Sequence, residues 1–113
     1  MAISLLKLFA PTVLGTAAAV VYTCPTSPTS SVVKNGRIRF TNTSGAVVTV
    51  TAYAVPSAGT PAAGNTFLNT YPISGNGYFD IDLPTLASGD TLQALASAAT
   101  SITVHEIGGV ISQ

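Results

Sequence analysis

The sequence predicts an all-β protein, an antiparallel β-sandwich or jelly roll of seven to eight short strands. Apolar and polar residues alternate in several short segments, such as Arg37 to Thr41 and Tyr78 to Leu83, and this period of two is typical of half-buried strands. Clusters of Gly, Pro, Asn and Ser separate these segments at intervals of about 8 to 12 residues, as in sandwiches and barrels. No segment has the pattern of an amphipathic helix.

Length and composition indicate one domain whose surface faces other protein. The chain has 113 residues, enough for one hydrophobic core, and is 47% apolar but only 7% charged, with a net charge of zero. Surfaces with so little charge tend to associate. The four Lys and Arg residues form no cluster of the kind that binds nucleic acid, and no apolar run reaches the roughly 20 residues that span a membrane.

The first half of the chain predicts an early strand and then a hairpin. Residues 16–23 are rich in Val and Ala and end at Cys24, the single cysteine, which excludes a disulfide within the chain. A strand follows from Val32 to Thr41, and its Asn35-Gly36 pair is either a tight turn or, as we favour, a bulge. We expect Arg37 to Asn42 and Ala46 to Val55 to form an antiparallel hairpin.

The second half continues with strands and one long loop. Pro56 to Asn65 is uncharged and long for a hairpin connection, so we expect an exposed loop and a contact surface. Strands are expected from Thr66 to Ile73, Thr91 to Ala98 and Ser101 to Ile107. The segment Leu92 to Ala99 has a composition that suits a helix, but it is short and has threonines at its ends, which favours a strand.

The residues that could do chemistry are few. His105 and Glu106 are neighbours in a predicted strand and therefore point to opposite faces, and no G-x-S-x-G motif supplies a nucleophile. Cys24 has no second cysteine or histidine at metal-ligand spacing. We therefore predict no catalytic, cofactor-binding or metal-binding residues and no enzymatic activity.

Two pairs of charged residues share the same spacing. Asp80 and Asp82 lie two residues apart on one face of a strand, and so do Arg37 and Arg39. A Ca²⁺ site at the two carboxylates is a weaker alternative, because the sequence supplies no further acidic ligands. We expect the acidic pair to meet the basic pair across strands or across a subunit boundary; the alternative is two unrelated solvated faces.

With these strands placed, the chain resembles the small virion proteins of tailed bacteriophages. The similar features lie, in order, at Val20 to Pro25, Arg37 to Gly45, Val47 to Val50, Leu83 to Leu92 and Ile102 to Glu106. The resemblance covers about residues 16 to 110. It implies a β-sandwich or jelly-roll subunit displayed in many copies on the head or tail, used for decoration, capsid cementing or host attachment, with no catalytic residues.

The resemblance also implies a division into an N-terminal arm, residues 1–15, and a β-sandwich domain, residues 16–113. The arm would lie on a neighbouring subunit and bury apolar side chains there, each worth about 1.5 to 3 kcal/mol before ordering costs. These expected interface residues are Leu5, Leu6, Leu8, Phe9, Val13 and Leu14, and the charged residues Arg37, Arg39, Asp80 and Asp82 complete the set.

The expected function is that of a phage capsid decoration or cement protein on the capsid surface of the virion. Its partners would be the major capsid protein and copies of itself in a homotrimer, with no cofactor, nucleic acid or membrane involved. One alternative is a tail or fibre component that attaches to a host surface through the Pro56 to Asn65 loop. Another is a secreted bacterial β-sandwich domain whose leader would be cleaved near Ala17-Ala18-Ala19.

Overall fold

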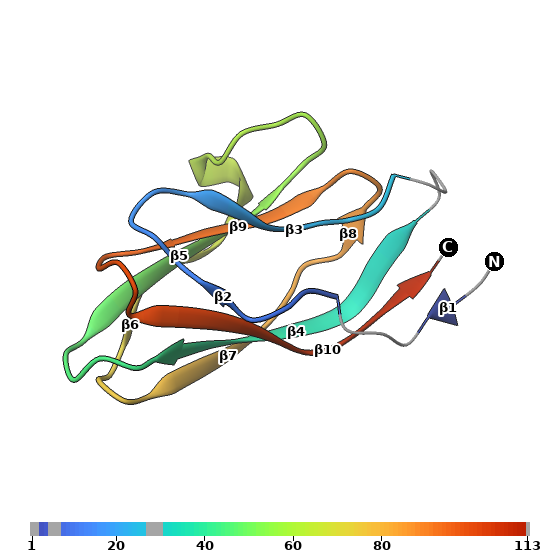
Figure 1. Ribbon diagram of the computed structural model, residues 1–113. Coiled ribbons are helices and arrows are strands. Elements are labelled where there is room, and N and C mark those ends of the chain that lie inside the picture. The colour runs from blue at the N-terminus through green and yellow to red at the C-terminus, as the bar shows by residue number, and fades with distance from the viewer. Residues whose placement is uncertain (1–2, 5–7, 27–30, 113) are drawn as a thin grey trace.

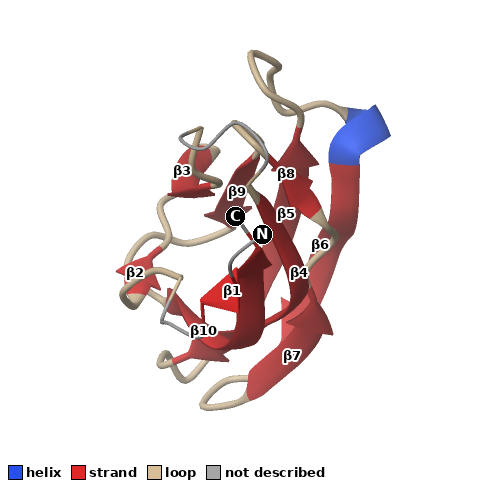
Figure 2. Ribbon diagram, turned by 90° about the vertical axis from the view of Figure 1, so that its right-hand side faces the viewer, coloured by secondary structure: helices blue, strands red, loops and turns tan. Residues whose placement is uncertain are grey.

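The computed structural model describes residues 3–4, 8–26 and 31–112. These residues form two antiparallel sheets that pack face to face, plus one turn of 3₁₀ helix, η1 (Ala63–Asn65) (Figures 1 and 2). The strands of the described residues are β1 (Ile3–Ser4), β2 (Thr12–Val13), β3 (Ala19–Thr23), β4 (Val32–Asn42), β5 (Val48–Val55), β6 (Thr66–Ile73), β7 (Tyr78–Asp82), β8 (Leu86–Ala87), β9 (Thr91–Ala96) and β10 (Ile102–Ser112). The prediction of an all-β sandwich is confirmed.

The strand pairing identifies the sandwich as a jelly roll. Sheet A contains β2, β10, β4 and β7 in that order, with β1 beside β10 and β8 beside β4, and sheet B contains β3, β9, β5 and β6. The antiparallel partners are nested along the chain, because β5 pairs with β6, β4 with β7, β3 with β9 and β2 with β10. These eight paired strands form one long hairpin rolled into two layers of four, which is the jelly-roll arrangement, and β1 and β8 extend sheet A.

The core lies between the inner faces of the two sheets. Ile38 and Phe40 of β4 face Val50 of β5 and Leu92 of β9, and all four side chains are fully buried. Each occupies an alternate position of its strand, as the period of two in the sequence predicts. Burying an apolar side chain of this size contributes about 1.5 to 3 kcal/mol, so these alternating positions carry much of the stability.

The predicted hairpin between Arg37 to Asn42 and Ala46 to Val55 is wrong, because β4 and β5 lie in different sheets. The chain turns a corner after Asn42, whose side chain is fully buried. Its Nδ2 donates to the carbonyl oxygens of Ala46 at 2.8 Å and Ile73 at 3.0 Å, and its Oδ1 accepts from the backbone N–H of Ser44 at 3.0 Å. These bonds hold the turn as a crossing between the layers.

The described part of residues 1–15 belongs to the sandwich, which corrects the division into an arm and a domain. Strands β1 and β2 pair with β10 of the same chain. Leu8 and Leu14 are 9% and 3% exposed in the chain's own core, so they need no neighbouring subunit to bury them. Phe9 packs partly buried against that core and Val13 is 56% exposed. Leu5 and Leu6 lie outside the described residues.

The Asn35-Gly36 pair lies inside a continuous strand, as the favoured interpretation predicts. β4 runs through it without a turn, and its register against β10 shifts on both sides of Gly108, so that residues 35 and 36 of β4 lie opposite Gly109 alone. Gly109 has a φ of +140°, and a Cβ there would lie 3.1 Å from the Cα of Gly36. Glycine is needed at this close approach of two backbones.

Candidate interaction surfaces

Charge is distributed very unequally between the two sheets. Strands β3, β5, β6 and β9 of sheet B, all of them described, contain no Asp, Glu, Lys, Arg or His. The charged residues that lie in described strands are all in sheet A, on β4, β7 and β10. The two outer faces of the molecule therefore offer different chemistry to a partner.

The centre of the outer face of sheet A holds a bidentate ion pair. Arg39 of β4 lies directly opposite Asp80 of β7, with Nε 2.7 Å from Oδ1 and Nη2 3.0 Å from Oδ2. The guanidinium hydrogen bonds hold the pKa of the Asp80 carboxyl below its usual range, and the same bonds raise the pKa of Arg39. The Arg39 guanidinium carbon also lies 4.3 Å from the centre of the Tyr78 ring, in a cation–π contact.

A second, looser ion pair lies beside the first. We call the four residues Arg37, Arg39, Asp80 and Asp82 the charge ladder. Arg37 lies opposite Asp82, but their closest charged atoms are 3.7 Å apart and their side chains are 54% and 86% exposed. A pair this exposed contributes little to stability. The predicted meeting of the basic and acidic pairs across strands is thus present within one chain, and its role at a subunit boundary stays a prediction. No group of three potential metal-binding side chains gathers among the described residues.

His105 lies beside this ladder on β10, opposite Arg39. Its Nδ1 is buried, and the described residues give that atom no hydrogen-bond partner. Glu106, one residue further, lies opposite Ile38 and therefore on the other side of the sheet. The two residues do not form a side-by-side acid and base, as their adjacent positions predict.

The outer face of sheet B is polar but uncharged. One row crosses all four strands, with Val20 opposite Gln93, Gln93 opposite Tyr53, and Tyr53 opposite Thr66. Val20 is 53% exposed on this face. The exposed groups of this face are therefore amides, hydroxyls and apolar side chains. A partner can bury them without desolvating an ion.

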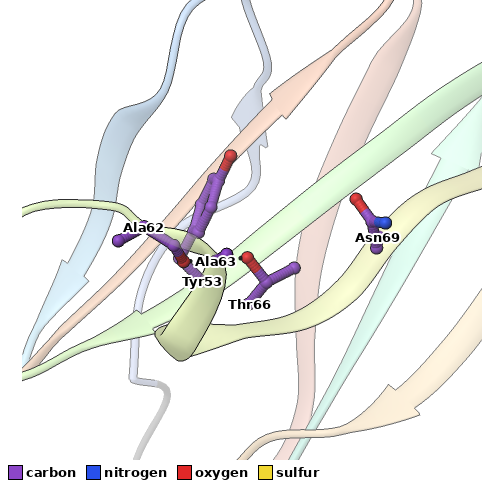
Figure 3. Close-up of a pocket in the computed structure, with 5 residues that line it drawn as sticks. All are labelled: Tyr53, Ala62, Ala63, Thr66 and Asn69. Atoms are coloured by element: carbon purple, nitrogen blue, oxygen red, sulfur yellow. Dashed lines mark hydrogen bonds between the residues drawn. The ribbon is translucent and has the colours of Figure 1, made fainter.

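A hollow of about 440 Å³ lies at one end of this face (Figure 3). Tyr53 of β5 and Thr66 and Asn69 of β6 line it, and Ala62 and Ala63 close it from the loop before β6. An aromatic ring beside hydroxyl and amide groups suits a neutral polar ligand. The sequence predicts the loop as a contact surface but gives no sign of the hollow, because its residues come from segments that only the fold brings together.

The loop that borders the hollow is held in one shape by Asn65. The side-chain Oδ1 of Asn65 accepts from the Ala62 N–H at 3.0 Å, and its Nδ2 donates to the carbonyl oxygen of Thr60 at 3.0 Å. Thr66 Oγ1 donates to the carbonyl oxygen of Ala62, also at 3.0 Å. These local bonds replace the secondary structure that a segment of Gly, Pro and Ala lacks.

Small residues dominate one end of the sandwich, at the left of Figure 1. Four uncharged connections gather there, at residues 14–18, 43–47, 74–77 and 97–101. Backbone hydrogen bonds join them, from the Thr43 N–H to the Ser101 oxygen at 2.9 Å and from the Asn76 N–H to the Ser44 oxygen at 2.9 Å. A Cβ on Gly75 would lie 2.5 Å from the carbonyl carbon of Gly45, so this end is tightly packed.

Comparison with known proteins identifies no family for this chain. No protein-family model matches the sequence, and no curated protein matches it. A chain in the solved structure of infectious bursal disease virus, Gt strain, is similar with a TM-score of 0.45 and 10% identity, over 97% of this chain. The present chain spans 30% of the length of that chain. No helix among the described residues is long and apolar enough to cross a membrane.

Proposed function

We propose that the protein is a structural subunit of a phage virion, a decoration or cement protein that stabilises the head lattice from the capsid surface. The observation that carries the proposal is the uncharged outer face of sheet B, in a chain that is only 7% charged. A protein exposed to water over its whole surface normally carries more charge, because near-neutral surfaces tend to associate. The proposed partners are the major capsid protein and copies of the chain itself, in a homotrimer.

The proposed mechanism is the burial of surface across a boundary between capsid subunits, without any covalent step. A stable interface needs about 800 Å² from each partner, a modest share of the chain's accessible surface of 5645 Å². A subunit that binds the assembled lattice and not its separated parts stabilises the assembled state by mass action. The uncharged sheet B suits this role because its burial leaves no ion without water or a partner.

Two exposed valines provide a matched test of which sheet meets the capsid. Val20 on sheet B and Val13 on sheet A are 53% and 56% exposed, and both lie in short strands. We expect Val20→Asp to weaken adsorption to capsids lacking the protein by about tenfold or more, because a buried charge without a partner is costly. Val13→Asp should adsorb like the wild type.

The measurement is co-sedimentation of the purified chain with such capsids, together with gel densitometry of intact particles. A decoration protein should be present in roughly hundreds of copies per particle, because it repeats with the symmetry of the capsid lattice. The proposal fails if the wild-type chain does not adsorb, or if the two aspartate variants lose adsorption equally.

Host-surface attachment is the second candidate, and the hollow beside Tyr53 favours it. An uncharged site with an aromatic ring, a hydroxyl and an amide has the chemistry that recognises neutral sugars. Under this alternative the protein would be scarce in the particle and would bind host cells. Under this alternative Tyr53→Ala would abolish cell binding, whereas the decoration role predicts no cell binding for either form.

A further inference from the structure

The charges on the outer face of sheet A are complementary to themselves. Arg37 and Arg39 form a column on β4, and Asp82 and Asp80 form a parallel column on the neighbouring strand β7 at the same register. A positive column therefore runs beside a negative one in a face whose net charge from these four residues is zero. Such a face can meet a copy of itself without bringing like charges together.

Only one two-fold arrangement in the plane of the face uses this pattern. An axis parallel to the strands and between β4 and β7 exchanges the two columns and keeps every row in place. Arg37 then lies over Asp82 of the second copy, and Arg39 lies over Asp80 of that copy. An axis across the strands places arginine over arginine, which costs free energy because like charges repel. The register of the ladder therefore selects the first arrangement.

The Arg39–Asp80 row and the Arg37–Asp82 row would have different roles in this contact. The Arg39–Asp80 pair is bidentate and its carboxylate side chain is only 20% exposed, so it holds the face in shape. The Arg37–Asp82 pair is 3.7 Å apart with most of both side chains exposed, so these groups retain free hydrogen-bonding capacity. Tyr78, which is 62% exposed and follows Asp80 along the β7 column, adds apolar surface to the same face.

We propose that the outer face of sheet A binds a second copy of this chain, face to face, about a two-fold axis that runs between β4 and β7. Aligned packing of two sheets is a common arrangement, and a contact of this symmetry uses the same residues twice. The contact rests on the proposed function only in needing many copies close together, and on a particle it would join one homotrimer to the next. In solution it exists without any capsid.

Charge-reversal variants separate this contact from the ion pairs within one chain. Arg37→Asp gives a row with two negative charges, and Asp82→Arg gives a row with two positive charges. Each variant repels its own copies, whereas the two variants attract each other when mixed. We expect each variant alone to self-associate about tenfold or more weakly than the wild type, and an equal mixture to recover wild-type affinity or better.

The measurement is sedimentation equilibrium of the full chain, with circular dichroism to verify that each variant folds. The mixture is the decisive arm, because mixing cannot repair a charge pair within one chain. Wild-type association should weaken as salt rises from 0.05 to 0.5 M, since screening shortens the reach of exposed charges to a few Å, about 4 Å at the higher value. Val20→Asp, on the other sheet, should associate like the wild type.

The proposal is overturned if the wild-type chain is monomeric at millimolar concentration, or if the mixture of Arg37→Asp and Asp82→Arg associates no better than either variant. Capsid adsorption is scored separately in the same preparations. A chain that adsorbs to capsids but remains monomeric refutes the sheet A contact alone, and a chain that dimerises but ignores capsids refutes the decoration role alone.

Discussion

Sheet A and sheet B have similar inner faces and very different outer ones. On the inside, both contribute alternate Val, Ile, Leu, Ala and Phe residues to one core. On the outside, sheet A has a ladder of paired charges, and sheet B has only hydroxyl, amide and apolar groups. Stability is thus shared between the layers, whereas recognition is divided, with one face suited to a self-complementary contact and the other to an uncharged partner.

The edges of the two sheets differ in the same way. The edge strand β7 of sheet A presents Asp80 and Asp82, and charge on an edge discourages pairing with another chain. The edge strand β6 of sheet B has no charge, but Pro72 and two register shifts against β5 interrupt its ladder. Tyr71 and Phe79 pack edge to face at 4.1 Å between these two strands. At these two edges, sheet A therefore discourages pairing with another chain by charge, and sheet B by a proline and irregular pairing.

The largest effect is expected where the two sheets are joined, at Asn42. Replacing Asn42 with Ala removes five side-chain hydrogen bonds, three that Nδ2 donates to the carbonyl oxygens of Ala46, Ile73 and Ser74 and two that Oδ1 accepts from the N–H and hydroxyl of Ser44. We expect a loss of about 3 kcal/mol in the free energy of unfolding, from two or more buried hydrogen bonds at about 1 to 1.5 kcal/mol each.

Urea unfolding followed by circular dichroism measures this loss, and Thr43→Ala is the control. Thr43 is the exposed neighbour, and its hydroxyl donates a long bond of 3.4 Å to the Ser101 oxygen. Its replacement should change the unfolding free energy by no more than about 0.5 kcal/mol. Equal losses for the two variants would mean that the corner does not depend on the buried amide.

A smaller effect is expected at Asp90, which precedes β9 and ties the segment after β5 in sheet B to β8 in sheet A. Its Oδ1 accepts from the Ser57 N–H and its Oδ2 from the Ala87 N–H, both at 3.0 Å. Asp90→Ala should lower the free energy of unfolding by about 1.5 to 2 kcal/mol, because hydrogen bonds to a charged group are the stronger ones.

Asp82→Ala provides the matching carboxylate on sheet A. Asp82 is 86% exposed and loosely paired, so its removal should cost no more than about 0.5 kcal/mol at a concentration where the chain is monomeric. Both variants are compared by urea unfolding at low protein concentration. If the two losses were the same, the Asp90 carboxylate would have no special structural role in joining the two sheets at this end.

The sequence is sufficient to predict the fold class and the strands, because both follow from local signals. Alternation at Ile38 and Phe40 marks a half-buried strand wherever that strand lies in the fold. The matched spacing of Arg37 and Arg39 with Asp80 and Asp82 predicts the charge ladder for the same reason. Which residues of a strand share a face depends on the strand alone and does not change with the order of strands in the sheets.

The sequence is not sufficient to predict which sheet receives each strand. The turn after Asn42 has the composition of a hairpin. It becomes a corner only through the hydrogen bonds of Asn42 to Ile73 and Ser74, which lie far along the chain. The sequence predicts Leu8 and Leu14 in an apolar arm because β10, the strand that pairs with β2 between them, lies almost at the other end of the chain. The hollow beside Tyr53 also depends on such distant neighbours.

The smallest expected effect is a pH dependence that belongs to sheet A. The Arg39 hydrogen bonds hold the pKa of Asp80 below its usual range in the folded state, so the unfolded chain binds the proton more readily. The stabilisation from this pair is therefore complete above about pH 3.9, the ordinary value for Asp, and is lost as the pH falls through the lower folded value.

Asp80→Asn should remove this component, so its urea midpoint falls less than that of the wild type between pH 5 and pH 2. Arg39→Gln should do the same, because the shift needs both partners; an unchanged acid response in either variant would contradict the assignment. Sheet B has no titratable carboxylate in its strands, and it should therefore contribute nothing to the difference.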